Sequence, residues 1–119
     1  MALFKRKNDN KVGKTDDVSN TTMTAFDKIQ FIAVEDSSDD TLLDISNKIL
    51  DGYPVLVNFE KLGLQESNNM LSFLSGVVYA TEGQTLRIQP RLFLLGRREE
   101  FEDGTLYQYY EDLKWFYLI

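Results

Sequence analysis

Four short stretches of the chain carry the side-chain pattern of β-strands. Residues 28–35 and 54–60 are rich in β-branched and aromatic side chains and are flanked by polar residues. The second stretch is apolar on both faces, which predicts an interior position in a sheet. Residues 84–89 and 91–96 alternate apolar and polar positions on either side of Pro90, so we expect two antiparallel strands joined by a tight turn.

The segment between the first two strands has the period of a helix. Ser37 or Ser38 is a suitable N-cap, and acidic residues follow in the first turn, where they favour the positive end of the helix. Gly52 is placed to end this helix, and Pro54 stops its continuation. The apolar positions recur at helical spacing and comprise Leu42, Leu43, Ile45, Ile49 and Leu50.

A second helix is predicted from about residue 65 to about residue 81, running through Gly76. Its apolar residues recur at helical spacing, and Glu82-Gly83 provides a stop. Glycine inside a helix costs about 1 kcal/mol relative to alanine. The explanations that stay open are a tolerated glycine, a helix that frays at this point, or the close approach of another backbone, from the neighbouring helix or from a partner subunit.

These elements follow the order βαβαββ and predict an α/β two-layer sandwich, with two helices on one face of a small mixed sheet. We expect this core domain to occupy residues 25–96. Residues 1–24 are mostly polar and are predicted to be disordered. Residues 97–119 begin with charge and end in an aromatic-rich extension that fits either a helix or an added strand. We expect its aromatic surface to be covered by the core, a partner chain or a membrane.

Composition narrows the classes of function. The chain has 119 residues, of which 43% are hydrophobic, so one domain with a substantial core is expected. A net charge of −6 argues against nucleic-acid binding, which needs a basic surface. The sequence has no cysteine and no histidine, which excludes disulfides, cysteine-based zinc sites and catalysis by thiols or histidines. There is no signal-peptide pattern and no apolar run of about 20 residues, so we expect a cytoplasmic location.

Candidate chemistry is sparse. Residues 13–15, GKT, resemble the end of a phosphate-binding loop but lack its upstream glycine and follow no strand. The acidic pairs at 16–17 and 39–40 are interpreted as solvated charge and helix N-terminal charge, and neither a metal site nor a cofactor is predicted. Residues 97–100, RREE, are expected to end the last strand as solvated charge. These observations favour a binding or structural module over an enzyme.

Three segments are specific enough to carry a resemblance: PVLVN at 54–58, FLSGVVYATEG at 73–83 and RIQPRLFLL at 87–95. In this order and spacing, the chain resembles the SepF family of bacterial cell-division proteins over about residues 30–95. The resemblance implies a fold like the one derived above, a homodimer that can polymerise, and a non-enzymatic role. It also implies two partners at the division site: the C-terminal tail of the tubulin-like GTPase FtsZ, and the inner face of the membrane.

The resemblance also implies site residues. In the family, a basic residue and an aromatic residue six positions later contribute to the FtsZ-tail pocket, and here these positions hold Arg87 and Phe93. Arg91 adds charge nearby. A short acidic and apolar peptide is suited to a cation beside an apolar pocket. The plainer interpretation is that Phe93 belongs to the core and Arg87 is a solvated strand residue.

Self-association and membrane contact are expected at two other places. Gly76 falls on the family glycine of the second helix, so we expect self-association there, together with Phe73 and Val77. The N-terminus offers two apolar side chains followed by three cations, each worth about 1 kcal/mol near anionic lipid. The predicted membrane-contact residues are Leu3, Phe4, Lys5, Arg6 and Lys7.

The chain departs from the family pattern in three places. Its amphipathic start is shorter, its first strand runs into Glu35-Asp36 where a proline is usual, and the extension beyond about residue 97 matches nothing characteristic. Two other classes of function are considered. One is a small regulatory domain that binds an anionic metabolite through an arginine cluster. The other, a carboxylate hydrolase, lacks an identifiable acid–base pair. The cluster would comprise Arg87, Arg91, Arg97 and Arg98.

Overall fold

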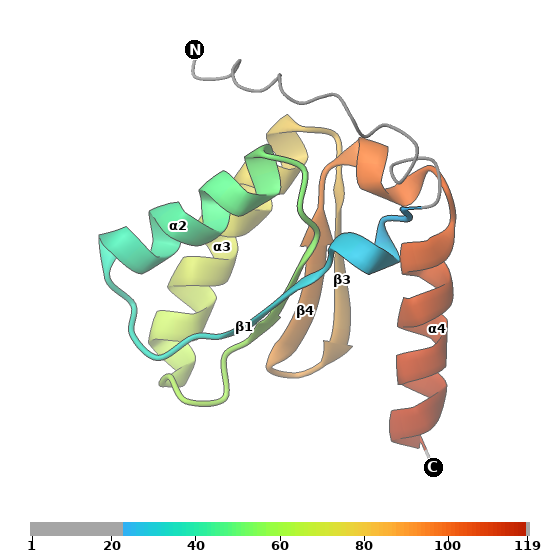
Figure 1. Cartoon of the computed structure of the whole chain (residues 1–119). Coiled ribbons are helices and arrows are strands. Elements are labelled where there is room, and N and C mark those ends of the chain that lie inside the picture. The colour runs from blue at the N-terminus through green and yellow to red at the C-terminus, as the bar shows by residue number, and fades with distance from the viewer. Residues whose placement is uncertain (1–22, 119) are drawn as a thin grey trace.

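A four-stranded mixed sheet lies between two layers of helix in the computed structural model, which describes residues 23–118 (Figure 1). Helices α2 and α3 cover one face of the sheet, and α4 covers part of the other. The strands are β1 (Gln30–Ala33), β2 (Val55–Asn58), β3 (Gln84–Gln89) and β4 (Leu92–Gly96). The helices are α2 (Asp39–Leu50), α3 (Leu64–Ala80) and α4 (Thr105–Leu118), with short 3-10 helices η3 (Phe26–Lys28) and η4 (Arg98–Phe101).

The strand order confirms the predicted mixed sheet. The strands lie in the order β1-β2-β4-β3, with β1 and β2 parallel and the other two pairs antiparallel. A parallel pair needs a long crossover, which α2 supplies. The interior position predicted for β2 is confirmed, as is the hairpin of β3 and β4 with its turn at Pro90. The register of that hairpin shifts between Arg87 and Gln89.

Local sequence signals explain where α2 and α3 begin and end. The hydroxyl of Ser38 caps α2 by accepting a hydrogen bond from the amide of Thr41 at 3.2 Å. After the helix, Gly52 adopts a φ of 101°, a conformation that favours glycine. Helix α3 runs uninterrupted through Gly76, as predicted. It ends at a turn in which Glu82, a non-glycine residue, has a φ of 58°.

The main core lies between the sheet and the α2/α3 layer. The residues of β2 alternate as predicted, so that Val55, Val57 and Phe59 belong to this core while Leu56 points to the opposite face. The cluster of buried residues comprises Val34, Ile45, Ile49, Val55, Val57, Phe59, Met70, Leu74, Val78, Phe93 and Leu95.

The C-terminal extension adds a third layer to the predicted two-layer sandwich. It is a helix, and the alternative of an added strand is wrong. Part of its apolar surface packs on the core, which is one of the three predicted ways of covering it, but Trp115 and Phe116 remain 68% exposed, contrary to the expectation. Leu106 of α4 is fully buried against Leu56 of β2 and Leu94 of β4. Three further residues of α4 pack against the same cluster: Tyr109, Tyr110 and Leu113.

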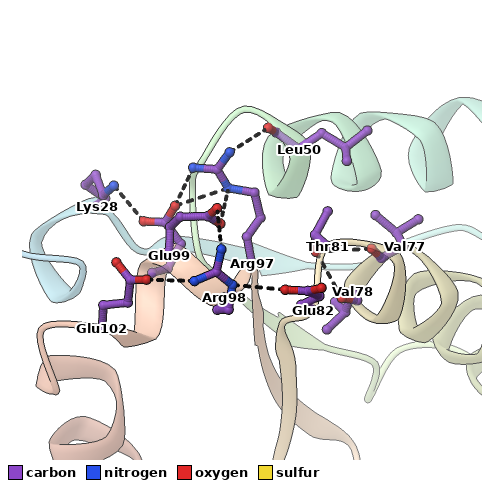
Figure 2. A network of polar contacts seen from close by, with 11 residues as sticks. Lys28, Leu50, Val77, Val78, Thr81, Glu82, Arg97, Arg98, Glu99 and Glu102 are labelled. Carbon is purple, nitrogen blue, oxygen red and sulfur yellow. Dashed lines mark hydrogen bonds and ion pairs between the residues drawn. The ribbon is translucent and has the colours of Figure 1, made fainter.

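Polar contacts join the extension to the segment before β1. The carboxylate of Glu100 accepts from Lys28 Nζ at 2.6 Å and from Arg97 Nη2 at 2.7 Å, and its side chain is only 3% exposed. The expectation that residues 97–100 are solvated charge is therefore wrong for Glu100. The reason lies in the tertiary structure, because η4 turns this carboxylate inward, where Lys28 of η3 and Arg97 neutralise it. Arg97 also reaches the carbonyl of Leu50 at the end of α2 (Figure 2).

A second set of polar contacts lies at the start of α4. The carboxylate of Asp103 accepts from the amides of Ala25 at 3.0 Å and Thr105 at 2.9 Å. These backbone hydrogen bonds, with that of Ala25 the stronger cause, hold the pKa of Asp103 below its usual range. The hydroxyl of Thr105 accepts from the amide of Phe26 at 3.0 Å. We call the contacts of Glu100, Asp103 and Thr105 with residues 25–28 the terminal clamp.

Candidate functional site

The structure brings Arg87 and Phe93 together, although they lie six positions apart in the chain. They lie directly opposite each other in the antiparallel pair of β3 and β4. The guanidinium carbon of Arg87 lies 5.9 Å from the centre of the Phe93 ring, within the range of a cation–π contact. Arg87 is exposed at the surface, whereas Phe93 is only 7% exposed. The ring of Phe93 packs edge-on against Phe59 at 6.0 Å, so it belongs to the main core.

Arg87 is one of two cations that no carboxylate neutralises in the part of the chain that the structure describes. Five of the eight basic side chains between residues 23 and 118 form ion pairs with carboxylates: Lys28, Lys48, Lys61, Arg97 and Arg98. Arg87 and Lys114 have no carboxylate partner among the described residues, and each lies over an aromatic ring instead. An exposed, unpaired guanidinium on a sheet edge can receive a carboxylate from a partner.

Arg91, the third predicted peptide-binding residue, is used inside the protein. Its Nη2 donates hydrogen bonds to the carbonyls of Phe59 and Leu62 and to the hydroxyl of Ser67 at 2.9 Å. The amide of Phe59 donates in turn to the carbonyl of Arg91 at 2.8 Å. These contacts fix the β3–β4 turn against the loop before α3. They place Arg91 as a support for the end of the hairpin that carries Phe93.

The other two arginines of the proposed cluster pair with carboxylates instead of converging on a free site. Arg98 is bound by Glu82 at 3.1 Å and by Glu102 at 3.0 Å (Figure 2). Arg97 is bound by Glu100 and lies beside Gly52. Because both charges are balanced by neighbouring acids, little positive potential remains at this end of the sheet for an anionic ligand.

Helix α3 presents the predicted self-association residues along one stripe. Phe73 is 47% exposed, Gly76 is exposed and Val77 is partly buried. A methyl group added at Gly76 would meet no atom within 4 Å. Close approach of the neighbouring helix within the chain is therefore excluded as the reason for this glycine. A tolerated glycine and contact with a partner subunit remain.

Phe73 also lines a shallow groove of about 260 Å³ between α2 and α3, whose other walls are Asp39, Leu42 and Leu43. Both leucines are among the apolar positions that recur at helical spacing in this segment. Leu43 is nevertheless half exposed, so part of the apolar stripe of α2 faces outward. The sequence could have indicated this exposed apolar surface, because the apolar positions of α2 cover a wider arc of the helix than one buried face requires.

Some predictions fall on residues that the structure does not describe, and others concern metal sites and membrane-spanning helices. The predicted membrane contacts at Leu3, Phe4, Lys5, Arg6 and Lys7 lie outside the described residues, as does nearly all of the segment 1–24 predicted to be disordered. Between residues 23 and 118, no cluster of three or more acidic side chains is arranged to hold a metal ion. Within that same range, no helix is long and apolar enough to cross a membrane.

Comparison with known proteins shows which part of the chain matches a known family. A family model described as cell division protein SepF matches residues 31–96. The chain is 32% identical over 63 residues to the SepF of Natranaerobius thermophilus, covering 53% of this chain and 38% of that protein. It is 28% identical over 87 residues to the SepF of Carboxydothermus hydrogenoformans, covering 66% and 64%. The matched region therefore spans less than two thirds of each of these relatives. It includes both helices of the α2/α3 layer and the Arg87–Phe93 pair, and it ends before η4.

Proposed function

The chain belongs to the SepF family of cell division proteins, which are not enzymes, and from this premise we propose that it is an adaptor of the division ring. In this role it binds the C-terminal tail of the tubulin-like GTPase FtsZ. It also associates with itself and contacts the inner face of the membrane, so that the ring and the membrane are linked while the septum forms.

The observation that carries the proposal is the unpaired charge of Arg87. A tail peptide with an acidic residue and apolar side chains would place its carboxylate on this guanidinium. Phe93 lies beneath Arg87 and orients it through the cation–π contact, while Arg91 holds the turn of the hairpin. Phe93 is buried, so its contribution is to position Arg87 and the strand rather than to offer an open apolar surface.

Self-association is proposed on the outer surface of α2 and α3. A second copy approaching there would cover Phe73 and the half-exposed Leu43. The open space above Gly76 lets another backbone come close at this point. Membrane contact is proposed for residues 3–7 on their chemistry alone: two or three inserted side chains and three cations bind one chain only marginally. Many linked copies would strengthen the contact through avidity.

The test of the tail-binding site is a titration with a fluorescent FtsZ tail peptide. Arg87→Glu should abolish saturable binding because it replaces attraction by repulsion at the carboxylate. Lys61→Glu is the matched control, since it changes the charge equally at another exposed position. Equal affinity of the peptide for both variants would contradict the assignment of Arg87 to the tail-binding site. Phe93→Ala is a poorer probe because removal of a buried phenylalanine costs about 3–5 kcal/mol of stability.

Two further measurements test the other parts of the adaptor. Gly76→Lys should lower the oligomer mass in light scattering, because a long cation would occupy the space that a second helix needs. Deletion of residues 1–7 should abolish sedimentation with anionic liposomes. An unchanged oligomer mass, or equal pelleting, would remove the corresponding contact from the proposal. The metabolite-binding alternative loses its basis because Arg97 and Arg98 are paired with carboxylates.

A further inference from the structure

The sheet face that carries α4 is only partly covered. A groove of about 270 Å³ lies over β1, β2 and β4 beside that helix, with mostly apolar walls. Phe31 of β1 is 68% exposed in it. The groove also borders a free edge, since β1 pairs only with β2 and its outer backbone groups are available to an extended segment. The residues that line the groove are Phe31, Ile32, Ala33, Leu56, Asn58 and Leu92.

Charge is divided unevenly between the N-terminal segment and the rest of the chain. Residues 1–24 contain five basic and three acidic side chains, whereas residues 25–119 contain eight basic and sixteen acidic ones. Three acidic residues follow the ends of the two strands: Glu35 and Asp36 after β1, and Glu60 after β2. Glu35 pairs with Lys61 at 3.2 Å, so Asp36 and Glu60 supply the negative charge at this end. Among the described residues, Glu60 forms no ion pair.

We propose that residues 3–7, LFKRK, fold back onto this groove in the same molecule. Leu3 and Phe4 fill the apolar floor beside Phe31, and the three cations that follow face the acidic end. The occupant matches the site in both respects, because it combines apolar side chains with positive charge and the groove combines apolar walls with negative charge. Neither a second acidic core nor an acidic peptide would have this complementarity.

The tether is long enough for this contact. Residues 8–22 join the basic segment to Met23, and 15 residues can reach at most about 50 Å. Gln30, where β1 begins, is seven residues from Met23 and hence within about 25 Å of it. The tether is longer than this separation, so the segment can reach the groove, and a linker of this length gives an effective concentration there on the order of millimolar. A weak contact is therefore sufficient for substantial occupancy.

The proposed fold-back has a regulatory consequence, which rests on the membrane contact proposed above. The same apolar and basic side chains cannot occupy the groove and insert into lipid at once. Docking therefore lowers the fraction of molecules competent for the membrane. A strongly anionic membrane shifts the segment from the acidic groove to the lipid, and so does simultaneous binding of one membrane by many linked copies.

Docking is tested first without any lipid. The chain has no cysteine, so Ala2→Cys allows a single nitroxide label beside Leu3 in the otherwise intact protein. Paramagnetic broadening should remove the amide signals of Phe31, Ala33 and Asn58, and leave those at the outer end of α3 near Tyr79 intact. Uniform broadening, or none, would overturn the proposal. Broadening that appears when unlabelled isotope-enriched protein is mixed with spin-labelled protein would assign the groove to a second copy instead.

Paired variants then separate docking from lipid binding. Phe31→Ser should restore the lost signals, whereas Tyr79→Ser, which removes another exposed aromatic ring on the opposite layer, should not. Replacing residues 5–7 by serine should also restore them. If the docked form holds three quarters of the molecules, Phe31→Ser should bind vesicles containing anionic lipid about fourfold more tightly than the unsubstituted protein. Unchanged affinity with restored signals would overturn the regulatory step. No vesicle binding by any variant would reject the membrane contact and leave the docking result standing.

Discussion

The two helical layers of this protein are attached to the sheet in different ways. The α2/α3 layer is joined to the sheet mainly by one apolar cluster. The hydroxyls of its buried serines, Ser46 and Ser67, donate to carbonyls four residues earlier, and Ser67 also accepts from Arg91. The α4 layer has a smaller apolar cluster and depends also on the terminal clamp. That clamp joins residues 72 to 79 positions apart in sequence.

This difference predicts how the stability of each layer should respond to substitutions. Loss of an aliphatic side chain beneath α2 and α3 affects the core to which β1, β2 and β4 all contribute. Loss of a clamp residue affects mainly the contact between the two ends of the described chain, which can open while the rest stays folded. The boundary between the two behaviours falls where the family match ends, at residue 96. The following substitutions test this contrast.

Leu74→Ala should have the largest effect. Leu74 is fully buried in the main core, so its truncation should lower the free energy of unfolding by about 2–5 kcal/mol. Leu64→Ala makes the same chemical change at an exposed position of the same helix and should cost less than about 0.5 kcal/mol. Urea denaturation measures both. Similar midpoints for the two variants would contradict the account of the main core.

Glu100→Gln should come next, at about 2–3 kcal/mol. Removing the charge of a buried carboxylate leaves Lys28 and Arg97 without their partner, and the cost is moderated because both cations remain partly exposed to water. Glu99→Gln alters the exposed neighbour and should be nearly neutral. Hydrogen exchange should show protection lost in η4, α4 and η3 but retained in α3. A uniform loss of protection would show that the two layers unfold as one unit.

Asp103→Asn should cost about 1 kcal/mol at pH 7, because the amide nitrogen cannot accept the hydrogen bond from Ala25. The pKa of Asp103 is lowered from 3.8 by that bond, so its stabilisation is fully present above pH 3.8 and is lost as the pH falls through the lowered pKa. The difference between the two proteins should therefore shrink in acid. Asp51→Asn, whose side chain makes no such bond, serves as the control in thermal unfolding across pH. A difference that grows on acidification would contradict this role.

Glu82→Gly should have the smallest effect and the opposite sign. Glycine relieves the positive φ at the end of α3, which is worth up to about 1 kcal/mol, while the exposed ion pair to Arg98 that is lost contributes less. Glu82→Gln keeps the backbone conformation and removes only the charge, so it isolates the ion pair. A net loss of stability in the glycine variant would mean that this link between α3 and η4 matters more than the strain beside it.

Much of the candidate site could be anticipated from local patterns. The alternation around Pro90 predicted the hairpin, and a hairpin places Arg87 near Phe93 whatever the rest of the chain does. The role of Arg91 could not be anticipated, because its acceptors lie on a loop about 30 residues away. Nor could it be anticipated that Arg87 has no carboxylate partner between residues 23 and 118, since that depends on where every acidic side chain lies.

The sequence by itself determined the elements of this protein and their order, because caps, helical spacing and strand alternation act over a few residues. Ser38, Gly52 and the alternation of β2 are cases in which the local signal was sufficient. Only the tertiary structure decided that α4 lies opposite α2 and α3, that Glu100 is buried, and that Phe31 faces a groove left uncovered. These outcomes depend on burial and charge balance between distant segments. The free energies of burial and charge balance are sums over the whole fold, so no periodic pattern in the sequence reveals them.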